Sequence, residues 1–155
     1  MRMQGKIGLV TAAGSGMGKA GAIRFAREGA SVSVVDINPE AVDAVVKEIK
    51  DAGGNAIGIV ADLTKDEESK RIVTETANHF EGLDFVWNHV GYPGPASIEG
   101  IEMKDFELTL DLNLRTILVT TEAALSEFRI RGGGTLLYTA SVSYTHLTLP
   151  TIYSV

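Results

Sequence analysis

The sequence of 155 residues contains no cysteine, few aromatic residues and no long hydrophobic run. The lack of cysteine excludes disulfide bonds and thiolate metal sites, and it is typical of a cytoplasmic protein. No apolar stretch approaches the ~18 residues that a membrane-spanning helix needs. The first residues also lack the pattern of a secretory signal. We therefore expect a cytoplasmic protein that makes no use of a membrane.

Positive charge is scarce as well. Against 20 acidic residues there are 14 Lys and Arg, which gives a formal net charge of −6. This balance argues against an electrostatic nucleic-acid surface, so we expect no nucleic-acid partner. The chain is 45% hydrophobic and 22% charged, a composition that is ordinary for a globular domain and atypical of disorder.

Short apolar segments rich in Val and Ile alternate with longer amphipathic segments. The strands are predicted at residues 6–12, 31–37, 55–61, 83–90 and 132–141. The helices are predicted at residues 17–29, 39–54 and 64–80, with one short and one long helix within 102–130. Strands separated by helices indicate the α/β class, here a doubly wound parallel sheet with helices on both faces. Continuous apolar strands agree with burial of both faces.

A glycine-rich loop, "TAAGSGMG" (Thr11 to Gly18), lies between the first predicted strand and the first predicted helix. Gly14, Gly16 and Gly18 allow the backbone to approach a ligand closely, and the N-terminus of a helix favours a phosphate group. A tight strand-to-helix turn also favours glycine. On its own the loop leaves phosphate binding and a purely structural turn equally open.

Asp36 ends the second predicted strand, about 20 residues after Gly16. An acidic side chain at this place binds the ribose hydroxyls of NAD and repels the 2′-phosphate of NADP. The alternative is a helix cap, because "DINPEA" is also typical of the start of a helix. Together with the glycine loop, Asp36 favours the ribose role and therefore NAD, with NADP the less favoured cofactor.

With these features in place, the chain from Gly5 to Ser141 resembles the short-chain dehydrogenases/reductases, whose loop reads T-G-x-x-x-G-x-G. The resemblance implies a Rossmann fold, truncated here after the fifth strand. It also implies hydride transfer between NAD and a small alcohol or carbonyl substrate, in a parent protein that is a homodimer or homotetramer. The loop residues that it assigns to the cofactor are Gly14, Ser15, Gly16, Met17 and Gly18.

The resemblance assigns further residues to cofactor binding. Asp62 and Leu63 stand where the family contacts the adenine ring. Asn88 to Gly91, "NHVG", stand where the family has N-N-A-G, a segment that supports the cofactor and the central sheet. Each has a structural alternative: Asp62 as a helix cap, and Asn88 as a partner for loop backbone groups.

Two residues are assigned to catalysis in the same way. Asn113 stands where the family has the active-site Asn that holds a water of a proton relay, and Ser141 where a Ser hydrogen-bonds the substrate oxygen. The alternatives are an ordinary polar helix residue and a hydroxyl at the end of a strand.

The sequence departs from the family pattern at three positions. Ala12 replaces a glycine, and His89 and Val90 replace Asn and Ala. The additional methyl group of Ala12 is tolerated in many turns if φ stays negative. Neither His79 nor His89 has partners at metal-ligand spacing, so we expect no metal site.

The family's Tyr-x-x-x-Lys pair, in which the Lys lowers the pKa of the Tyr, is missing from the sequence. The chain itself is therefore expected to be inactive, and a non-catalytic dinucleotide-binding or regulatory module is the alternative function. Residues 142–155 contain no Asp, Glu, Lys, Arg, Gly or Ala, and they resemble a translated sequencing adaptor. We expect an incomplete NAD-binding domain over residues 1–141 and a non-native tail over 142–155.

Overall fold

The computed structural model describes residues 1–95 and 97–140. It contains a sheet of five strands in the order β3-β2-β1-β4-β5, and all four strand pairs are parallel. The strands are β1 (Ile7–Thr11), β2 (Ser31–Asp36), β3 (Asn55–Val60), β4 (Phe85–Asn88) and β5 (Thr135–Tyr138). The predicted doubly wound parallel sheet is confirmed.

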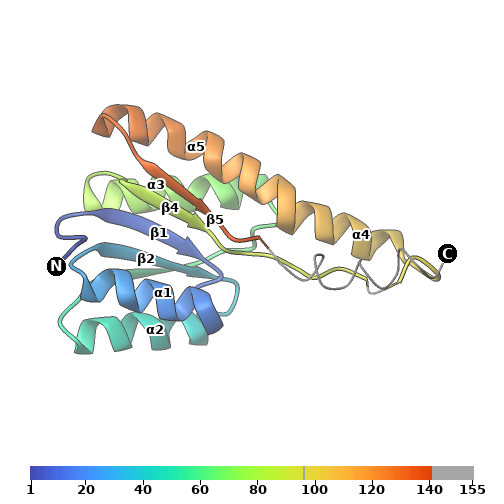
Figure 1. Cartoon of the computed structure of the whole chain (residues 1–155), viewed down its shortest axis with the longest axis horizontal. Coiled ribbons are helices and arrows are strands. Elements are labelled where there is room, and N and C mark those ends of the chain that lie inside the picture. Colours follow the sequence, from blue (N-terminus) through green and yellow to red (C-terminus); the bar gives the residue numbers. More distant parts are fainter. Residues whose placement is uncertain (96, 141–155) are drawn as a thin grey trace, which may run out of the picture.

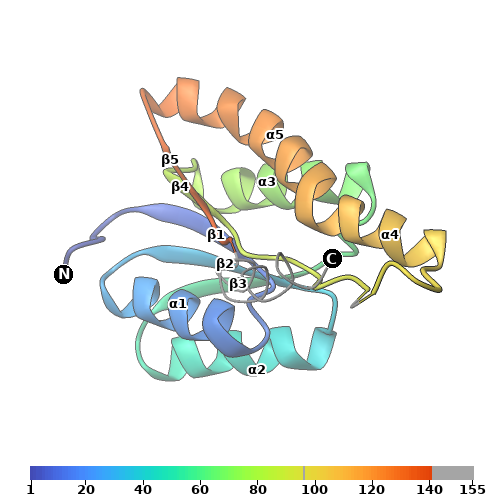
Figure 2. The same ribbon diagram turned by 45° about the vertical axis from the view of Figure 1, so that its right-hand side comes forward.

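Helices cover both faces of this sheet, as Figures 1 and 2 show. Helices α1 (Gly16–Arg27) and α2 (Pro39–Asp51) lie on one face, and α3 (Asp66–Phe80) and α5 (Thr116–Arg131) lie on the other. Each face has its own buried cluster of side chains, the first centred on Val10, Val32 and Val34 and the second on Leu9, Val35 and Val86. Alternate residues of a strand point to opposite faces, which explains why continuous apolar strands supply both clusters.

The beginning of α2 follows the sequence signals. Pro39 occupies the first turn, where its missing N–H has no cost. The N-cap is Asn38, whose side-chain oxygen accepts the backbone N–H of Ala41 at 3.1 Å. Asp36 is therefore not the cap of this helix, and its carboxylate is left for other contacts.

The predicted pair of helices within residues 102–130 is one continuous helical stretch. It consists of α4 (Met103–Leu110), a π-helical turn η1 (Asp111–Arg115) and α5. The sequence did not indicate the π turn, which contains Asn113. Arg115 pairs with Asp66 at the start of α3, Nε to Oδ1 at 2.7 Å and Nη2 to Oδ2 at 3.0 Å. This bidentate pair fixes the π turn to a neighbouring helix.

The last strand is shorter than predicted. The strand expected at 132–141 is β5, Thr135–Tyr138, because the glycines before it end α5 instead. Gly132 has φ 82° and Gly133 has φ 149°, conformations that favour glycine at the end of a helix. None of the helices in the described parts of the chain is both long and apolar enough to cross a membrane.

The parallel register brings the carboxyl ends of the strands together. Thr11 is paired with Val35, Asp36 with Val60, and Asn88 with Tyr138. Ligands of open α/β sheets bind at this end of the strands, near the point where the strand order reverses. In this sheet that point lies between β1 and β4.

Candidate functional site

The glycine loop presents the first turn of α1 to open space. The helix begins at Gly16, which has φ 53°, and no atom of the described residues lies within 4 Å of where its Cβ would be. The preceding Ser15 is the N-cap, yet its side chain makes no capping hydrogen bond. Met17 is exposed as well. Unpaired backbone N–H groups at an accessible helix N-terminus are suited to bind a phosphate.

Gly14 and Gly18 are required by packing within the chain. A Cβ on Gly18 would lie 2.1 Å from the backbone oxygen of Ala12, and one on Gly14 would lie 2.9 Å from the carboxyl carbon of Asp36. Of the three glycines that were expected to let a ligand approach, Gly16 alone faces free space. The other two allow the loop to fold against itself and against β2.

The conformation of Ala12 differs from the expectation. Its φ is 51°, in the left-handed region, and not negative. The loop thus keeps a backbone shape that glycine adopts freely, although the residue carries a methyl group. For a residue other than glycine this conformation costs about 1–2 kcal/mol.

Asp36 lies directly against the glycine loop. Its Oδ2 accepts the backbone N–H of Gly14 at 2.9 Å, and its Oδ1 accepts that of Asn38 at 3.1 Å. A carboxylate has about four acceptor sites, so two remain after these bonds. The structure therefore brings the acidic group and the helix N-terminus into one site.

Asp62 and Leu63 follow β3 and differ in exposure. The Asp62 carboxylate accepts the hydroxyl of Thr64 at 2.7 Å, and this hydrogen bond is the main reason that the pKa of Asp62 is lowered. Lys65, the N-cap of α3, pairs with the other oxygen at 3.2 Å. Asp62 thus stabilises the turn before α3 and is not its cap. Leu63 is buried in the core, where its contribution is to hold this turn on the sheet.

A hydroxyl that the sequence reasoning did not select organises the end of β4. Thr11 Oγ1 accepts the backbone N–H groups of His89 at 2.9 Å and Val90 at 3.0 Å. Its signal was its position as the last residue of an apolar strand and the first residue of the glycine motif. Thr11 thus supplies the hydrogen-bond acceptor for the backbone N–H groups of this loop. This role is the structural alternative given above for Asn88.

The Asn88 side chain is fully buried, and neither its oxygen nor its nitrogen has a hydrogen-bond partner among the described residues. A buried amide without partners is costly, by about 1–3 kcal/mol for each unsatisfied group. Such a group is expected to gain a partner from a ligand, from water or from residues outside the described ranges.

The Asn113 side chain joins the π turn to the loop after β4. Its Oδ1 accepts the backbone N–H of Tyr92 at 2.8 Å, and its Nδ2 donates to the Tyr92 oxygen at 2.7 Å. Gly91 is close to the same amide, since a Cβ there would lie 3.0 Å from Asn113 Oδ1. Asn113 is therefore more than an ordinary polar helix residue, because it positions the Gly91–Tyr92 segment. The predicted water-binding role stays a prediction.

A cavity of about 930 Å³ opens at the carboxyl ends of β4 and β5, beside the first turn of α1. Its apolar walls come from α1, from the loop after β4 and from α5. Its polar side chains come from the end of β4 and the loop after it, from η1, from α5 and from the end of β5. The lining residues are Met17, His89, Val90, Gly91, Tyr92, Pro93, Asn113, Ile117, Leu118, Thr121, Tyr138, Thr139 and Ala140. This size and mixture suit a small organic ligand.

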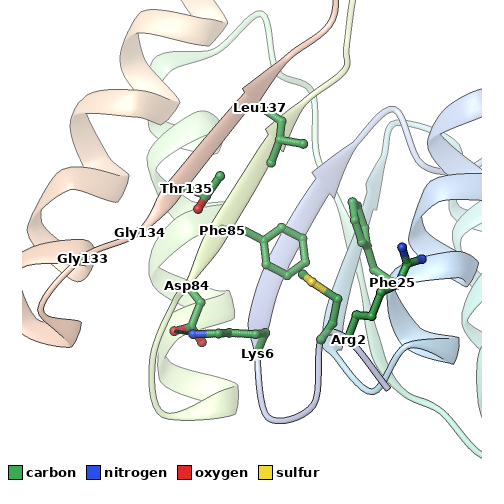
Figure 3. A pocket seen from close by; sticks show the side chains of 10 residues that line it. Arg2, Lys6, Phe25, Asp84, Phe85, Gly133, Gly134, Thr135 and Leu137 are labelled. Atoms are coloured by element: carbon green, nitrogen blue, oxygen red, sulfur yellow. Dashed lines mark ion pairs between the residues drawn. The ribbon is translucent and has the colours of Figure 1, made fainter.

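A second cavity, of about 440 Å³, lies at the opposite ends of the strands (Figure 3). Its charged side chains are Arg2, Lys6 and Asp84. Asp84 accepts the Ile7 N–H at 2.9 Å and the Arg131 guanidinium at 3.0 Å, and it pairs with Lys6 at 3.5 Å. Burial raises the pKa of the Asp84 carboxyl, but the hydrogen bonds from Arg131 and Ile7 outweigh it and lower the pKa. These contacts tie β1, β4 and α5 together, so we regard this group as structural.

Ser141, the second predicted catalytic residue, and the predicted tail 142–155 lie outside the described residues. The described ranges contain no cluster of three or more His, Asp or Glu residues that is able to hold a metal ion.

The profile of the family described as short chain dehydrogenase matches residues 6–154 of the sequence. Among characterised relatives, the 7alpha-hydroxysteroid dehydrogenase of Escherichia coli (strain K12) is 34% identical over 143 residues. That alignment covers 92% of this chain and 56% of the relative. The chain spans about half the length of the curated relatives it matches.

Solved structures share the same arrangement of strands and helices. A 7 alpha-hydroxysteroid dehydrogenase complexed with NADH and 7-oxo glycochenodeoxycholic acid superposes with a TM-score of 0.89 at 33% identity, covering 93% of this chain and 56% of that one. A short chain dehydrogenase from Burkholderia cenocepacia J2315 in complex with NADP gives 0.87 at 32% identity, covering 95% and 60%. Both nicotinamide dinucleotides therefore occur among the structural relatives.

Proposed function

The chain belongs to the short-chain dehydrogenase family, and from this premise we propose that it forms the NAD-binding part of an oxidoreductase acting on a small alcohol or carbonyl substrate. A bound nicotinamide cofactor supplies the group that accepts or donates hydride. This chain's own residues bind and orient it. The open first turn of α1 at Ser15 to Met17 suits the diphosphate, and Asp36 suits the adenosine ribose.

The observation that carries the proposal is the contact between Asp36 and the glycine loop. Gly14 N–H donates to Asp36 Oδ2 at 2.9 Å, so a carboxylate and a helix N-terminus border the same space. An anion-binding group and a hydroxyl-binding group that border one space suit the diphosphate and the ribose of an adenosine diphosphate. The buried amide of Asn88, which has no hydrogen-bond partner among the described residues, supports a ligand at the same end of the sheet.

Asp36 also decides which dinucleotide is preferred. Two unit charges at about 4 Å repel each other by about 1 kcal/mol in water and about 4 kcal/mol near a protein surface. Lys19 in α1 is already paired with Glu48 at 2.9 Å. We therefore expect NAD to bind at least about fivefold more tightly than NADP, which corresponds to about 1 kcal/mol. Calorimetric titration of the chain with both cofactors measures this ratio.

The matched variant for that experiment is Asp36→Asn, which removes the charge and keeps one oxygen acceptor. Gly14 and Asn38 donate to different carboxylate oxygens, so the variant keeps one of these two hydrogen bonds. It is expected to bring the two affinities within about twofold of each other, because the repulsion of the 2′-phosphate is removed. Tighter binding of NADP by the unmodified chain, or an unchanged ratio in Asp36→Asn, would contradict the assignment.

We also propose that the parent protein self-associates through the outer face of η1 and α5. The face of α5 that packs on the core is formed by Thr116, Thr120, Ala124 and Phe128, which are all buried. A different face carries Leu114 and Leu125, which are 54% and 39% exposed. Leu118 is 61% exposed and also lines the 930 Å³ cavity. A helix that is apolar on two faces needs a second partner, and an isologous contact with a second copy provides one.

Replacement of Leu114 by Glu places a charge within this face, at its η1 end. We expect the dissociation constant of the parent's dimer to rise at least about tenfold, because a carboxylate would have to be buried without a partner. Light scattering after size-exclusion chromatography measures the oligomeric state. The control is Val60→Glu, on the edge strand β3 at the other end of the sheet. This variant should leave the dissociation constant of the dimer unchanged. A monomeric parent would contradict the proposal.

A dinucleotide-binding module without catalysis is the alternative function. It is favoured by one observation, namely that Tyr92, Tyr138 and Tyr144 are followed four residues later by Ala96, Val142 and Thr148 and not by a lysine. The coding sequence of the parent protein distinguishes the two functions, since an enzyme requires that pair and a binding module does not.

A further inference from the structure

Three side chains meet at the carboxyl ends of β4 and β5. Trp87 Nε1 donates to Thr139 Oγ1 at 2.9 Å, and His89 Nδ1 lies 2.8 Å from the same oxygen. The rings of Trp87 and His89 are also in contact, with their centroids 4.9 Å apart. His89 is one of the positions at which this sequence departs from the family pattern, so the family's usual residues do not explain the arrangement.

The hydrogen bonds define how the imidazole is held. The indole N–H can only donate, so Thr139 Oγ1 accepts from Trp87 and keeps its own proton for another acceptor. In the neutral ring Nδ1 is that acceptor, and the ring proton is then on Nε2. When the ring is protonated, Nδ1–H donates to Oγ1, which has a second lone pair available. Both charge states of His89 are therefore compatible with Trp87 and Thr139.

The imidazole lies on the first turn of α1. A Cβ placed on Gly18 would be 2.9 Å from His89 Cδ2, so the ring packs against the helix terminus at which a diphosphate is expected. The backbone N–H of His89 is already bonded to Thr11 Oγ1. The side chain is thus the part of His89 that is left to interact with a ligand in the 930 Å³ cavity, whose wall it forms.

Charged groups around His89 are few. Among the described residues that line the cavity, the titratable groups are His89, Tyr92 and Tyr138, and none is an Asp, Glu, Lys or Arg. In α1, Lys19 is paired with Glu48, and across the glycine loop Asp36 is bonded to Gly14 and Asn38. Burial lowers the pKa of His89, and it is the cause of the shift. The ring is therefore mostly neutral near pH 7 in the absence of a ligand.

We propose that His89 is a cofactor-binding residue that couples binding of the dinucleotide diphosphate to the uptake of a proton, a role that rests on the proposed NAD-binding function. An imidazolium beside the N-terminus of α1 adds a positive charge where the diphosphate adds two negative ones. A bound diphosphate stabilises the protonated ring, so the affinity rises as the pH falls through the pKa of the free protein.

The first test needs no ligand. Trp87 is the single tryptophan of the chain, and its contact with His89 makes its fluorescence sensitive to the charge of the imidazole. The chain is prepared with His79→Gln and His146→Gln, which leaves His89 as its one histidine. Its fluorescence is expected to fall between pH 8 and pH 5 with a midpoint below 6.5. If the transition is lost in the additional variant His89→Asn, the contact between Trp87 and His89 is supported. If the transition persists in that variant, the contact is overturned.

The second test measures binding of ADP-ribose, which contains the diphosphate but lacks the charged nicotinamide ring. Calorimetry in buffers of different ionisation enthalpy is expected to show uptake of a fraction of a proton at pH 6. We also expect about three- to fivefold tighter binding at pH 5.5 than at pH 8, which corresponds to a rise of about half a pKa unit or slightly more on binding. His89→Asn should bind ADP-ribose with neither effect.

The outcomes separate this proposal from the proposed function. Binding of ADP-ribose that is independent of pH, or a pH dependence that survives in His89→Asn, overturns the role of His89 and leaves the NAD-binding function intact. Failure to bind ADP-ribose at any pH overturns both. Thr139→Val is an additional check on positioning, because it removes the Nδ1 partner and is expected to displace the midpoint of the fluorescence transition while the cavity keeps its His89 side chain.

Discussion

The chain of 155 residues is expected to bind ADP-ribose and yet to oxidise alcohols with NAD at a rate at least about 100-fold below that of its parent protein. Removal of a proton from the substrate oxygen by a positioned general base contributes about 10²–10⁴-fold to such reactions. The residues four positions after Tyr92 and Tyr138 are Ala96 and Val142, so neither phenol has the lysine that would lower its pKa. Absorbance of NADH with a panel of primary and secondary alcohols measures the rate.

The cavity itself supports the same expectation. The Tyr138 hydroxyl is 3.0 Å from Thr121 Oγ1, and no described lysine or arginine lines the cavity. No described cation in the cavity is therefore placed to stabilise a phenolate, which a tyrosine needs to act as a general base. The control is the parent protein, assayed with the same alcohols at the same cofactor saturation. Comparable turnover by both proteins would contradict the expectation and point to a different base in the cavity.

The order and type of the helices and strands were predictable because they depend on residues close together in the sequence. Apolar runs of β-branched residues, Pro39 in a first turn and glycines after helices each act within a few residues. The separation of the strands by helices then leaves a parallel sheet as the remaining solution. The strand order β3-β2-β1-β4-β5 comes from the structure, because the alternation of strands and helices does not by itself fix which strands are neighbours.

The candidate site was predictable where a single residue at the end of a strand carries the chemistry. Asp36 was placed beside the glycine loop from its spacing, and the structure gives the contact with Gly14. The alternative interpretation of Asp36 as a helix cap is wrong, because Asn38 is the N-cap of α2. A helix start with two acceptors in three residues does not reveal from sequence which of them is the cap.

Contacts between distant segments were not predictable. Trp87 and Thr139 are 52 residues apart, and Asn113 and Tyr92 are 21 apart. Nothing in the local pattern connects them, because their meeting depends on the register of β4 with β5 and on the π turn. The left-handed conformation of Ala12 was missed for a related reason, since the shape of the loop is fixed by the closeness of Gly18 and not by the preference of residue 12.

The close contact between Gly18 and the backbone oxygen of Ala12 leads to a prediction about stability and binding. Substitution of Gly18 by Ala is expected to lower the free energy of unfolding by at least about 2 kcal/mol and to weaken ADP-ribose binding at least tenfold. Helix propensity alone would favour Ala by about 1 kcal/mol in α1. The new Cβ, however, would lie 2.1 Å from the Ala12 oxygen. Overpacking costs about 1–3 kcal/mol. We expect a cost near the upper end of this range, because the overlapping atom belongs to the backbone and cannot move away by a change of side-chain rotamer.

Two matched variants separate this overlap from a general effect of substituting loop residues. Gly53→Ala has φ 79° and no atom within 4 Å of its new Cβ, so it should lose about 1–2 kcal/mol through backbone strain alone and keep its affinity for ADP-ribose. Ala12→Gly relieves the left-handed strain at the other end of the contact. Because glycine also gains freedom in the unfolded chain, its net effect is expected to lie between zero and about +1 kcal/mol. Chemical denaturation and calorimetry on the three variants give both quantities. The prediction fails if Gly18→Ala is as stable as the unmodified chain and binds ADP-ribose equally well. The loop would then accommodate a Cβ at residue 18 in spite of the close contact with the Ala12 oxygen.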